Sequence, residues 1–208
     1  NITRMLLLNR TKVRNYYKNL HILTKYKNTI LLKGGIESQK RILHIKGDHM
    51  IMKKFINDRR NLTSEMLEGL AAANKDILIL GKQRMIINRK LADARRVTVV
   101  AQGGSGNEPA VSGFVGEGMV DISGVGDIFA APDPQACLEA IKTADRGRGV
   151  LYIVQNHAGD MLTGDMTMER CARERLNVKW VVVREDIAIA PRSDPEDRGG
   201  LVGCVPLY

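Results

Sequence analysis

The sequence predicts an α/β domain in which a largely parallel sheet carries helices on both faces. Three near-continuous apolar runs, rich in β-branched residues, occur at residues 97–100, 150–154 and 178–183. Such runs are typical of strands that are buried on both faces. Helix-like segments alternate with them, as the crossovers between parallel strands require. With 208 residues, of which 44% are hydrophobic and 26% charged, the chain can bury one substantial core.

The net charge of +9 is confined to the beginning of the chain. Residues 1–50 hold 11 Lys or Arg and 2 Asp or Glu, whereas the remainder holds 21 of each kind. The composition changes abruptly near Met50 and Met52. We therefore expect residues 1–49 to be a basic extension outside the fold, and residues 50–208 to form the domain. We expect the natural start at Met50 or Met52 and interpret residues 1–49 as translated upstream sequence; a targeting segment and a nucleic-acid-binding arm are the alternatives.

Composition also narrows the classes of partner. The chain has no run of about 18 apolar residues and no ordered secretory signal, which predicts a cytoplasmic protein without a membrane partner. The neutral part of the chain has no basic stripe with interleaved aromatic residues, so we do not expect nucleic acid as a partner of the domain. Cys137, Cys171 and Cys204 show no C-x-x-C spacing, and we expect three reduced thiols and no metal site.

The first expected elements are a helix and a short strand. The helix begins near Thr63, which can cap it, and Glu65 falls in its first turn. Residues 84–88 are a short strand candidate. One face of the helix is apolar and consists of Met66, Leu67, Leu70 and Ala71.

Two further helices follow strands of the main pattern. Asp133 and Pro134 have the N-cap and first-turn preferences that open a helix over residues 134–144. A second helix is expected over residues 161–175. A weaker strand is expected at residues 120–123, within a segment of turns that is punctuated by Gly113, Gly116, Gly118, Gly124 and Gly126.

A glycine-rich segment follows the first apolar run and is the main candidate for a site. Glycine lets backbone N–H groups turn toward a bound oxygen without a Cβ in the way. The segment lacks the spacing of a Walker loop and of a dinucleotide-binding loop. It predicts a site for a small polar molecule, and a tight turn without a ligand is the alternative. Its members are Gly103, Gly104, Ser105, Gly106, Asn107 and Glu108.

A second polar loop is expected beside the first. Right-handed crossovers place the ends of parallel strands at one edge, so the loops after residues 100, 154 and 183 should meet there. The second loop carries Gln155, His157 and Asp160. Asp160 is either a buried acceptor for substrate hydroxyls or the N-cap of the following helix. His157 is either an acid–base group or a hydrogen-bonded bystander.

Several ordered motifs from about Met52 to the end of the chain resemble one family, the substrate-binding K subunit or domain of dihydroxyacetone kinase. The motifs are Met52-Lys53-Lys54-Phe55-Ile56-Asn57-Asp58, Glu65-Met66-Leu67-Glu68-Gly69-Leu70, Gly103-Gly104-Ser105-Gly106-Asn107-Glu108-Pro109, Gly113-Phe114-Val115-Gly116-Glu117-Gly118-Met119 and Asn156-His157-Ala158-Gly159-Asp160.

The resemblance implies a ketose site. In this family the K part binds a short ketose, such as dihydroxyacetone or an erythrulose-like analogue, and a separate helical L part carries ATP and magnesium. The positions that match Gly104 and Asp160 contact the ketose, and Asp160 becomes a candidate base. The resemblance also implies a homodimer in the full-length form, and no cofactor bound by this chain. The implied substrate-binding residues are Gly103, Gly104, Ser105, Gly106, Asn107, Gln155 and Asp160.

The chain departs from the family pattern at three places. Asn107 stands where the family has a catalytic histidine, and an amide cannot take up a proton near neutral pH. Gln155 stands where the family commonly has a lysine. The chain stops at Tyr208, before the second K domain with the histidine that forms a hemiaminal with the ketone. We therefore expect a truncated chain that is inactive alone, or, as the alternative, a non-catalytic ketose sensor or regulatory partner.

Overall fold

The structure, a computed structural model, describes residues 55–200. A compact unit begins at Ile56. The expectations for the basic extension and for Cys204 lie outside the described residues.

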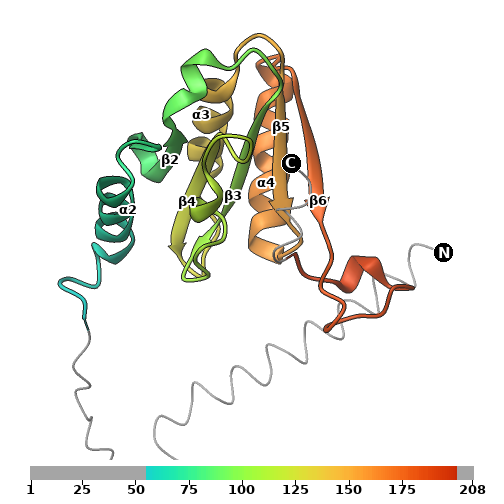
Figure 1. Ribbon diagram of the computed structural model, residues 1–208. Helices are drawn as coiled ribbons and strands as arrows, with labels where there is room; N and C mark the ends of the chain where they lie inside the picture. The colour runs from blue at the N-terminus through green and yellow to red at the C-terminus, as the bar shows by residue number, and fades with distance from the viewer. Residues whose placement is uncertain (1–54, 201–208) are drawn as a thin grey trace, which may run out of the picture. The chain divides into compact units, whose positions relative to one another are not determined.

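Within residues 55–200, one mixed sheet of six strands has the order β1-β2-β4-β3-β5-β6 (Figure 1). β3 pairs in parallel with β4 and β5, and β5 pairs in parallel with β6, whereas β1 and β2 form an antiparallel edge. The three apolar runs of the sequence are therefore strands, as predicted. The strands are β1 (Leu78–Leu80), β2 (Met85–Asn88), β3 (Thr98–Ser105), β4 (Ile122–Ile128), β5 (Val150–Gln155) and β6 (Val178–Val183).

Helices cover both faces of the sheet, which confirms the predicted fold class. α3 (Pro134–Ala144) and α4 (Ala158–Arg173) pack against each other on one face. α2 (Leu62–Ala73) packs against β1 and β4. Two buried clusters separate these faces, because successive strand residues point in opposite directions.

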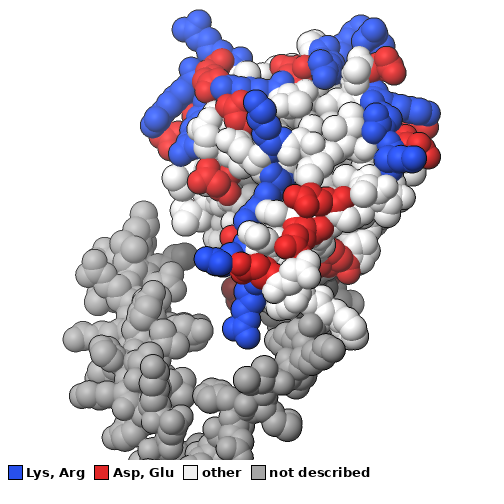
Figure 2. All heavy atoms as spheres, turned by 90° about the vertical axis from the view of Figure 1, so that its left-hand side faces the viewer, with Lys and Arg blue, Asp and Glu red and all other residues white. Residues whose placement is uncertain are grey.

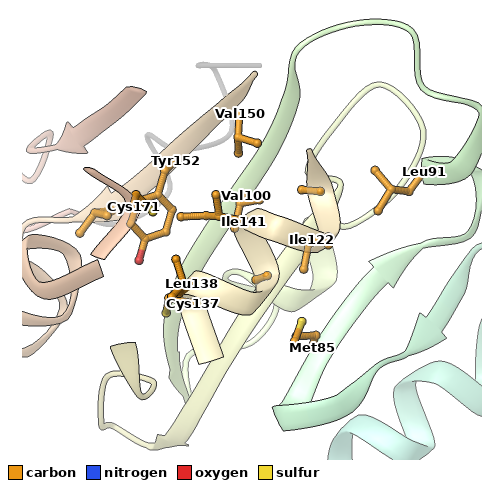
Figure 3. Close-up of a cluster of buried hydrophobic side chains, with 13 residues drawn as sticks. Met85, Leu91, Val100, Ile122, Cys137, Leu138, Ile141, Val150, Tyr152 and Cys171 are labelled. Atoms are coloured by element: carbon orange, nitrogen blue, oxygen red, sulfur yellow. The ribbon is translucent and has the colours of Figure 1, made fainter. Parts of the chain in front are cut away.

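The first cluster joins the sheet to α3 and α4 and includes Val100, Tyr152 and Cys171 (Figure 3). The second cluster joins the sheet to α2 and includes Leu67, Ala101 and Ile153. Cys137 and Cys171 are buried and free, as expected for reduced thiols.

The start of α3 agrees with the prediction from the sequence, whereas the start of α2 does not. Asp133 Oδ1 accepts a hydrogen bond from the backbone N–H of Gln135 at 2.6 Å, which confirms the predicted cap. α2 begins at Leu62, so Thr63 lies inside the first turn rather than at the N-cap. The capping role predicted for Thr63 is wrong, because its hydroxyl is buried 3.1 Å from Ser105 Oγ.

α4 begins at Ala158, three residues before the predicted start. His157 occupies the N-cap position without a side-chain cap, and Asp160 lies in the first turn. The alternative in which Asp160 caps the helix is therefore wrong. The chain turns into the helix directly after β5, and this leaves the Asp160 carboxylate free of a capping role.

β3 and β4 are longer than predicted. β3 continues through Gly103 and Gly104 to Ser105, and β4 runs through Gly126 to Ile128. The glycines here permit a close backbone approach and do not end the strands. A Cβ at Gly104 would lie 2.8 Å from the backbone N and O of Ala130, and a Cβ at Gly126 would lie 2.0 Å from that oxygen.

Residues 55–200 lack two features that define particular classes of site. No helix in this range is long and apolar enough to cross a membrane. The same range contains no cluster of three or more His, Cys, Asp or Glu side chains suited to a metal ion. On the face that carries α2 and β2, basic and acidic side chains are interspersed (Figure 2).

Candidate ligand-binding site

The candidate site lies where β3 and β5 end and α4 begins. Gln102 Nε2 in β3 donates a hydrogen bond to the backbone oxygen of Asp160 at 2.8 Å. A Cβ at Gly103 would lie 3.7 Å from Gln155 Oε1, the last side chain of β5. The fold thus brings the glycine-rich segment together with residues 155–160, called the Asp160 loop below, although Gln102 and Asp160 are 58 residues apart in the sequence.

The end of β6 and the loop that follows it are hydrogen-bonded to the Asp160 loop. The backbone N–H of Asn156 donates to Val183 O at 3.0 Å, and its side-chain amide donates to Arg198 O at 2.5 Å. His157 Nε2 lies 2.7 Å from the backbone oxygen of Gly200. This contact favours the bystander explanation of His157, since its ring holds the loop in place.

Asp160 is the buried carboxylate of the candidate site. Asp160 is only 7% exposed, and its Oδ1 is buried without a hydrogen-bond partner among the described residues. Burial raises the pKa of Asp160 to about 6, and the nearby charge of His157 opposes this rise. A carboxylate with a pKa near neutrality is ionised for most of the time at pH 7 and can still take up a proton. An oxygen left unpaired in this way is suited to a hydroxyl donor from a ligand.

Gly106 and Asn107 form the exposed turn that follows β3. Gly106 has a φ of +100°, a left-handed conformation that favours glycine. The Glu108 carboxylate accepts from the Gly106 N–H at 3.0 Å, so Glu108 stabilises the turn itself. Asn107 is exposed, and its backbone oxygen accepts from the N–H of Ala110 at 3.1 Å. The Asn107 side-chain amide is accessible from solvent.

Ser105 contributes to the fold through its side chain. Its hydroxyl is fully buried and donates to the backbone oxygen of Gly126 at 2.8 Å. The Thr63 hydroxyl lies on its other side, as described above. A ligand at this edge would therefore meet the backbone of Ser105 and not its hydroxyl.

Residues 129–131, which follow β4, border the site and were not singled out from the sequence. The backbone of Ala130 packs on Gly104, and a Cβ at Gly106 would lie 3.0 Å from Phe129 Cε1. Phe129 is nevertheless 73% exposed, so its ring stands at the rim of the glycine-rich turn. These contacts join residues that are distant in the sequence, and no sequence motif predicts them.

A pocket of about 360 Å³ lies beside this segment, between β4 and the start of α3. Arg84 and Asp127 line it and form an ion pair at 2.7 Å. Asn107, Gln155 and Asp160 do not line this pocket. The hollow is therefore separate from the predicted ligand residues.

The fold and the site define a class of protein: an α/β domain with polar and glycine-rich segments gathered at the carboxyl edge of its sheet, where open α/β sheets bind ligands. Residues 68–208 match the family model described as the Dak1 domain. The chain belongs to the Dak1 domain family.

The chain is 40% identical over 156 residues to the dihydroxyacetone-binding subunit DhaK of the PTS-dependent dihydroxyacetone kinase of Lactococcus lactis. This match covers 75% of the chain and 47% of the relative. The chain thus spans about half the length of the curated relatives it matches.

Solved structures share the fold. The dihydroxyacetone kinase from C. freundii, in complex with AMP-PNP and Mg²⁺, superposes with a TM-score of 0.65 at 32% identity, over 73% of this chain and 28% of the kinase. The dihydroxyacetone kinase operon co-activator DhaQ superposes with a TM-score of 0.61 at 26% identity, over 67% of this chain and 43% of that protein. The structures that this chain resembles thus include both a kinase and an operon co-activator.

Proposed function

We propose that this chain is the ketose-binding part of a dihydroxyacetone kinase, and that it holds a short ketose for phosphorylation of a terminal hydroxyl. The observation that carries the proposal is the buried Asp160 carboxylate. Its Oδ1 has no hydrogen-bond partner within residues 55–200, and burial raises its pKa to about 6. Membership of the Dak1 domain family and the names of the relatives support the same ligand class.

Each residue of the proposed site has a distinct task. Asp160 accepts the hydrogen bond, and then the proton, of the hydroxyl that is phosphorylated. Backbone N–H groups of the glycine-rich segment other than that of Gly106, together with the Asn107 amide, donate to carbonyl and hydroxyl oxygens of the ketose. Gln155, beside Gly103, supplies a neutral amide at the same wall.

The phosphate donor belongs to a partner in this proposal. An L-type subunit or domain carries ATP and magnesium, and the complex with AMP-PNP and Mg²⁺ of the C. freundii kinase supports nucleotide chemistry within the family. This chain alone is expected to transfer no phosphate from ATP to a ketose. A homodimer in the full-length form and a cytoplasmic location are part of the same proposal.

Titration of the 208-residue chain with dihydroxyacetone, followed by NMR or calorimetry, tests ketose binding. Asp160→Asn is expected to weaken the affinity at least about tenfold, because the amide cannot act as a charged acceptor. Asp165→Asn is the matched control, since Asp165 is exposed on the same helix and should leave the affinity unchanged. Equal affinities of the two variants would show that Asp160 does not bind the ketose.

A regulatory function is the second candidate. Asn107 cannot act as a proton acceptor, and the structural likeness to the co-activator DhaQ is consistent with ketose sensing without catalysis. An assay with an L-type partner, ATP, magnesium and dihydroxyacetone separates the two candidates. Turnover that rises in Asn107→His supports the kinase function, whereas ketose binding with no turnover in either form supports the sensor.

A further inference from the structure

A buried polar cluster lies directly beneath the candidate site. It consists of Gln102 on β3, Tyr152 on β5 and Cys137 on α3, each at most 1% exposed. Tyr152 OH and Cys137 Sγ both donate to Gln102 Oε1, the thiol at 2.9 Å. Figure 3 shows the Tyr152 hydroxyl directed toward Cys137 and Leu138 of α3. Through Nε2, the same amide holds the backbone oxygen of Asp160 on α4.

Hydrogen-bond chemistry determines how this amide is oriented. The carbonyl of Asp160 can only accept, so it requires the NH₂ end of Gln102. Burial raises the pKa of the Cys137 thiol to about 12 and that of the Tyr152 phenol well above its ordinary value. Both groups therefore keep their protons near neutral pH and serve as donors to Oε1. A reversed amide would place two acceptors against each other at Asp160, which a buried site disfavours.

We infer that Gln102 is a positioning residue for Asp160. It ties the first turn of α4 to β3 immediately before the glycine-rich segment, and so holds in place the backbone that carries the Asp160 carboxylate. The inference rests on the proposed function in so far as the carboxylate receives a ketose hydroxyl. Gln102 itself is 1% exposed and acts through Asp160 rather than on the ligand.

The hydrogen bond from Gln102 to the Asp160 backbone connects the two segments that form the candidate site. Gln102 immediately precedes the glycine-rich segment, and its amide reaches the backbone of the residue that carries the carboxylate. One side chain therefore sets the spacing between the two walls of the site. Misplacing a reacting group by about 1 Å can cost about 100-fold in rate, so a small shift of this turn has a measurable effect.

The test compares Gln102→Met with Tyr152→Phe in the 208-residue chain. Methionine keeps the length and approximate volume of Gln102 but removes the amide. Phenylalanine removes one buried hydrogen bond to the same amide and leaves the contact between Gln102 Nε2 and Asp160 O. The two readouts are the ¹³C NMR titration of the Asp160 carboxyl, assigned with Asp160→Asn, and the dihydroxyacetone affinity.

Gln102→Met is expected to lower the pKa of Asp160 toward its ordinary value, because the loosened turn admits water, and to weaken ketose binding about tenfold or more. Tyr152→Phe is expected to leave the pKa and the affinity as in the unsubstituted chain. Equal changes in both variants, or no change in either, would overturn the positioning role. If Gln102→Met does not fold, Gln102→Asn replaces it, since the shorter amide cannot reach both Tyr152 and Asp160 and should give the same two changes.

The two readouts keep this inference separate from the proposed function. If the unsubstituted chain binds no ketose but Gln102→Met still lowers the pKa of Asp160, the positioning role stands and the proposed ligand is wrong. If the unsubstituted chain binds ketose and Gln102→Met alters neither readout, the ligand stands and the positioning role is wrong.

Discussion

At the scale of single residues, burial gives the Asp160 carboxylate its chemical character. The ordinary pKa of an aspartate in water makes it a weak base at pH 7, whereas burial brings the pKa of Asp160 to about 6. The same burial destabilises the folded state when the group is ionised. A functional carboxylate placed in this way costs stability, which is common at active sites.

The pH dependence of unfolding should report this cost. The pKa of Asp160 is higher in the folded state, about 6 against 3.8, so this group favours folding at low pH, and its contribution is lost as the pH rises through about 6. Asp160→Asn, which does not titrate, should gain stability relative to the unsubstituted chain between pH 4 and pH 7, by up to about 3 kcal/mol. Urea unfolding at several pH values measures the difference. A difference that does not vary with pH would contradict the assignment, and Asp165→Asn provides the baseline.

Residue type alone did not show which polar side chains of the glycine-rich segment stabilise the fold and which are exposed to a ligand. Ser105 and Asn107 both have side chains that can bind a ligand. The structure buries the Ser105 hydroxyl against Gly126 O and exposes Asn107. Burial depends on what packs against the strand end, which is a non-local property. The ligand-binding roles of Asn107 and Gln155 stay predictions until a ligand is titrated.

At the scale of elements, strands and helices were predictable where local signals and packing agree. The Asp133-Pro134 start of α3 is a local signal and was predicted correctly. The end of β3 was not predicted correctly, because glycine has two structural roles that a sequence does not distinguish. It can end a strand, or it can let another backbone approach a strand that continues. At Gly104 the second use applies, since Ala130 packs where a Cβ would lie.

Alanine substitutions at three glycines separate packing from ligand binding. Gly104→Ala should destabilise the domain by about 1–3 kcal/mol, because the new methyl would meet the backbone of Ala130 at 2.8 Å. Gly103→Ala meets its neighbours only at ordinary distances of 3.7 Å or more, so it should fold normally and weaken ketose binding. Gly69→Ala, in an open position on α2, should stabilise the domain by about 0.5–1 kcal/mol.

Thermal or urea unfolding and a dihydroxyacetone titration of the three variants provide the measurements. A Gly104→Ala variant as stable as the unsubstituted chain would show that Ala130 can move aside. A Gly103→Ala variant with full affinity would place the ketose away from this wall.

At the scale of the whole molecule, charge is distributed unevenly along the chain. The net charge of +9 arises within residues 1–50, and the rest of the chain is balanced. Basic and acidic side chains are interspersed on the face shown in Figure 2. Polyelectrolyte binding by the whole chain should therefore depend on the extension.

A chain that begins at Met50 tests this expectation. Any binding of the 208-residue chain to duplex DNA should fall steeply with salt and disappear in the shorter chain, because phosphate contacts come from Lys and Arg. A filter-binding or anisotropy titration at several salt concentrations measures both chains. Retention of DNA binding after removal of residues 1–49 would assign it to the domain. Ketose affinity of the shorter chain serves as the control for folding.

The sequence by itself determined the alternation of strands and helices, the α/β class and the segments that supply a polar edge, because periodicity, capping and glycine content are local properties. Tertiary structure alone decided which of these groups act together. It extended β3 through its glycines and buried the Ser105 hydroxyl. It also left Asp160 Oδ1 without a partner in the described part of the chain and placed the Gln102 amide against the Asp160 backbone oxygen. The reason is that burial and hydrogen-bond partners are set by residues distant in the chain, and so a local pattern cannot encode them individually.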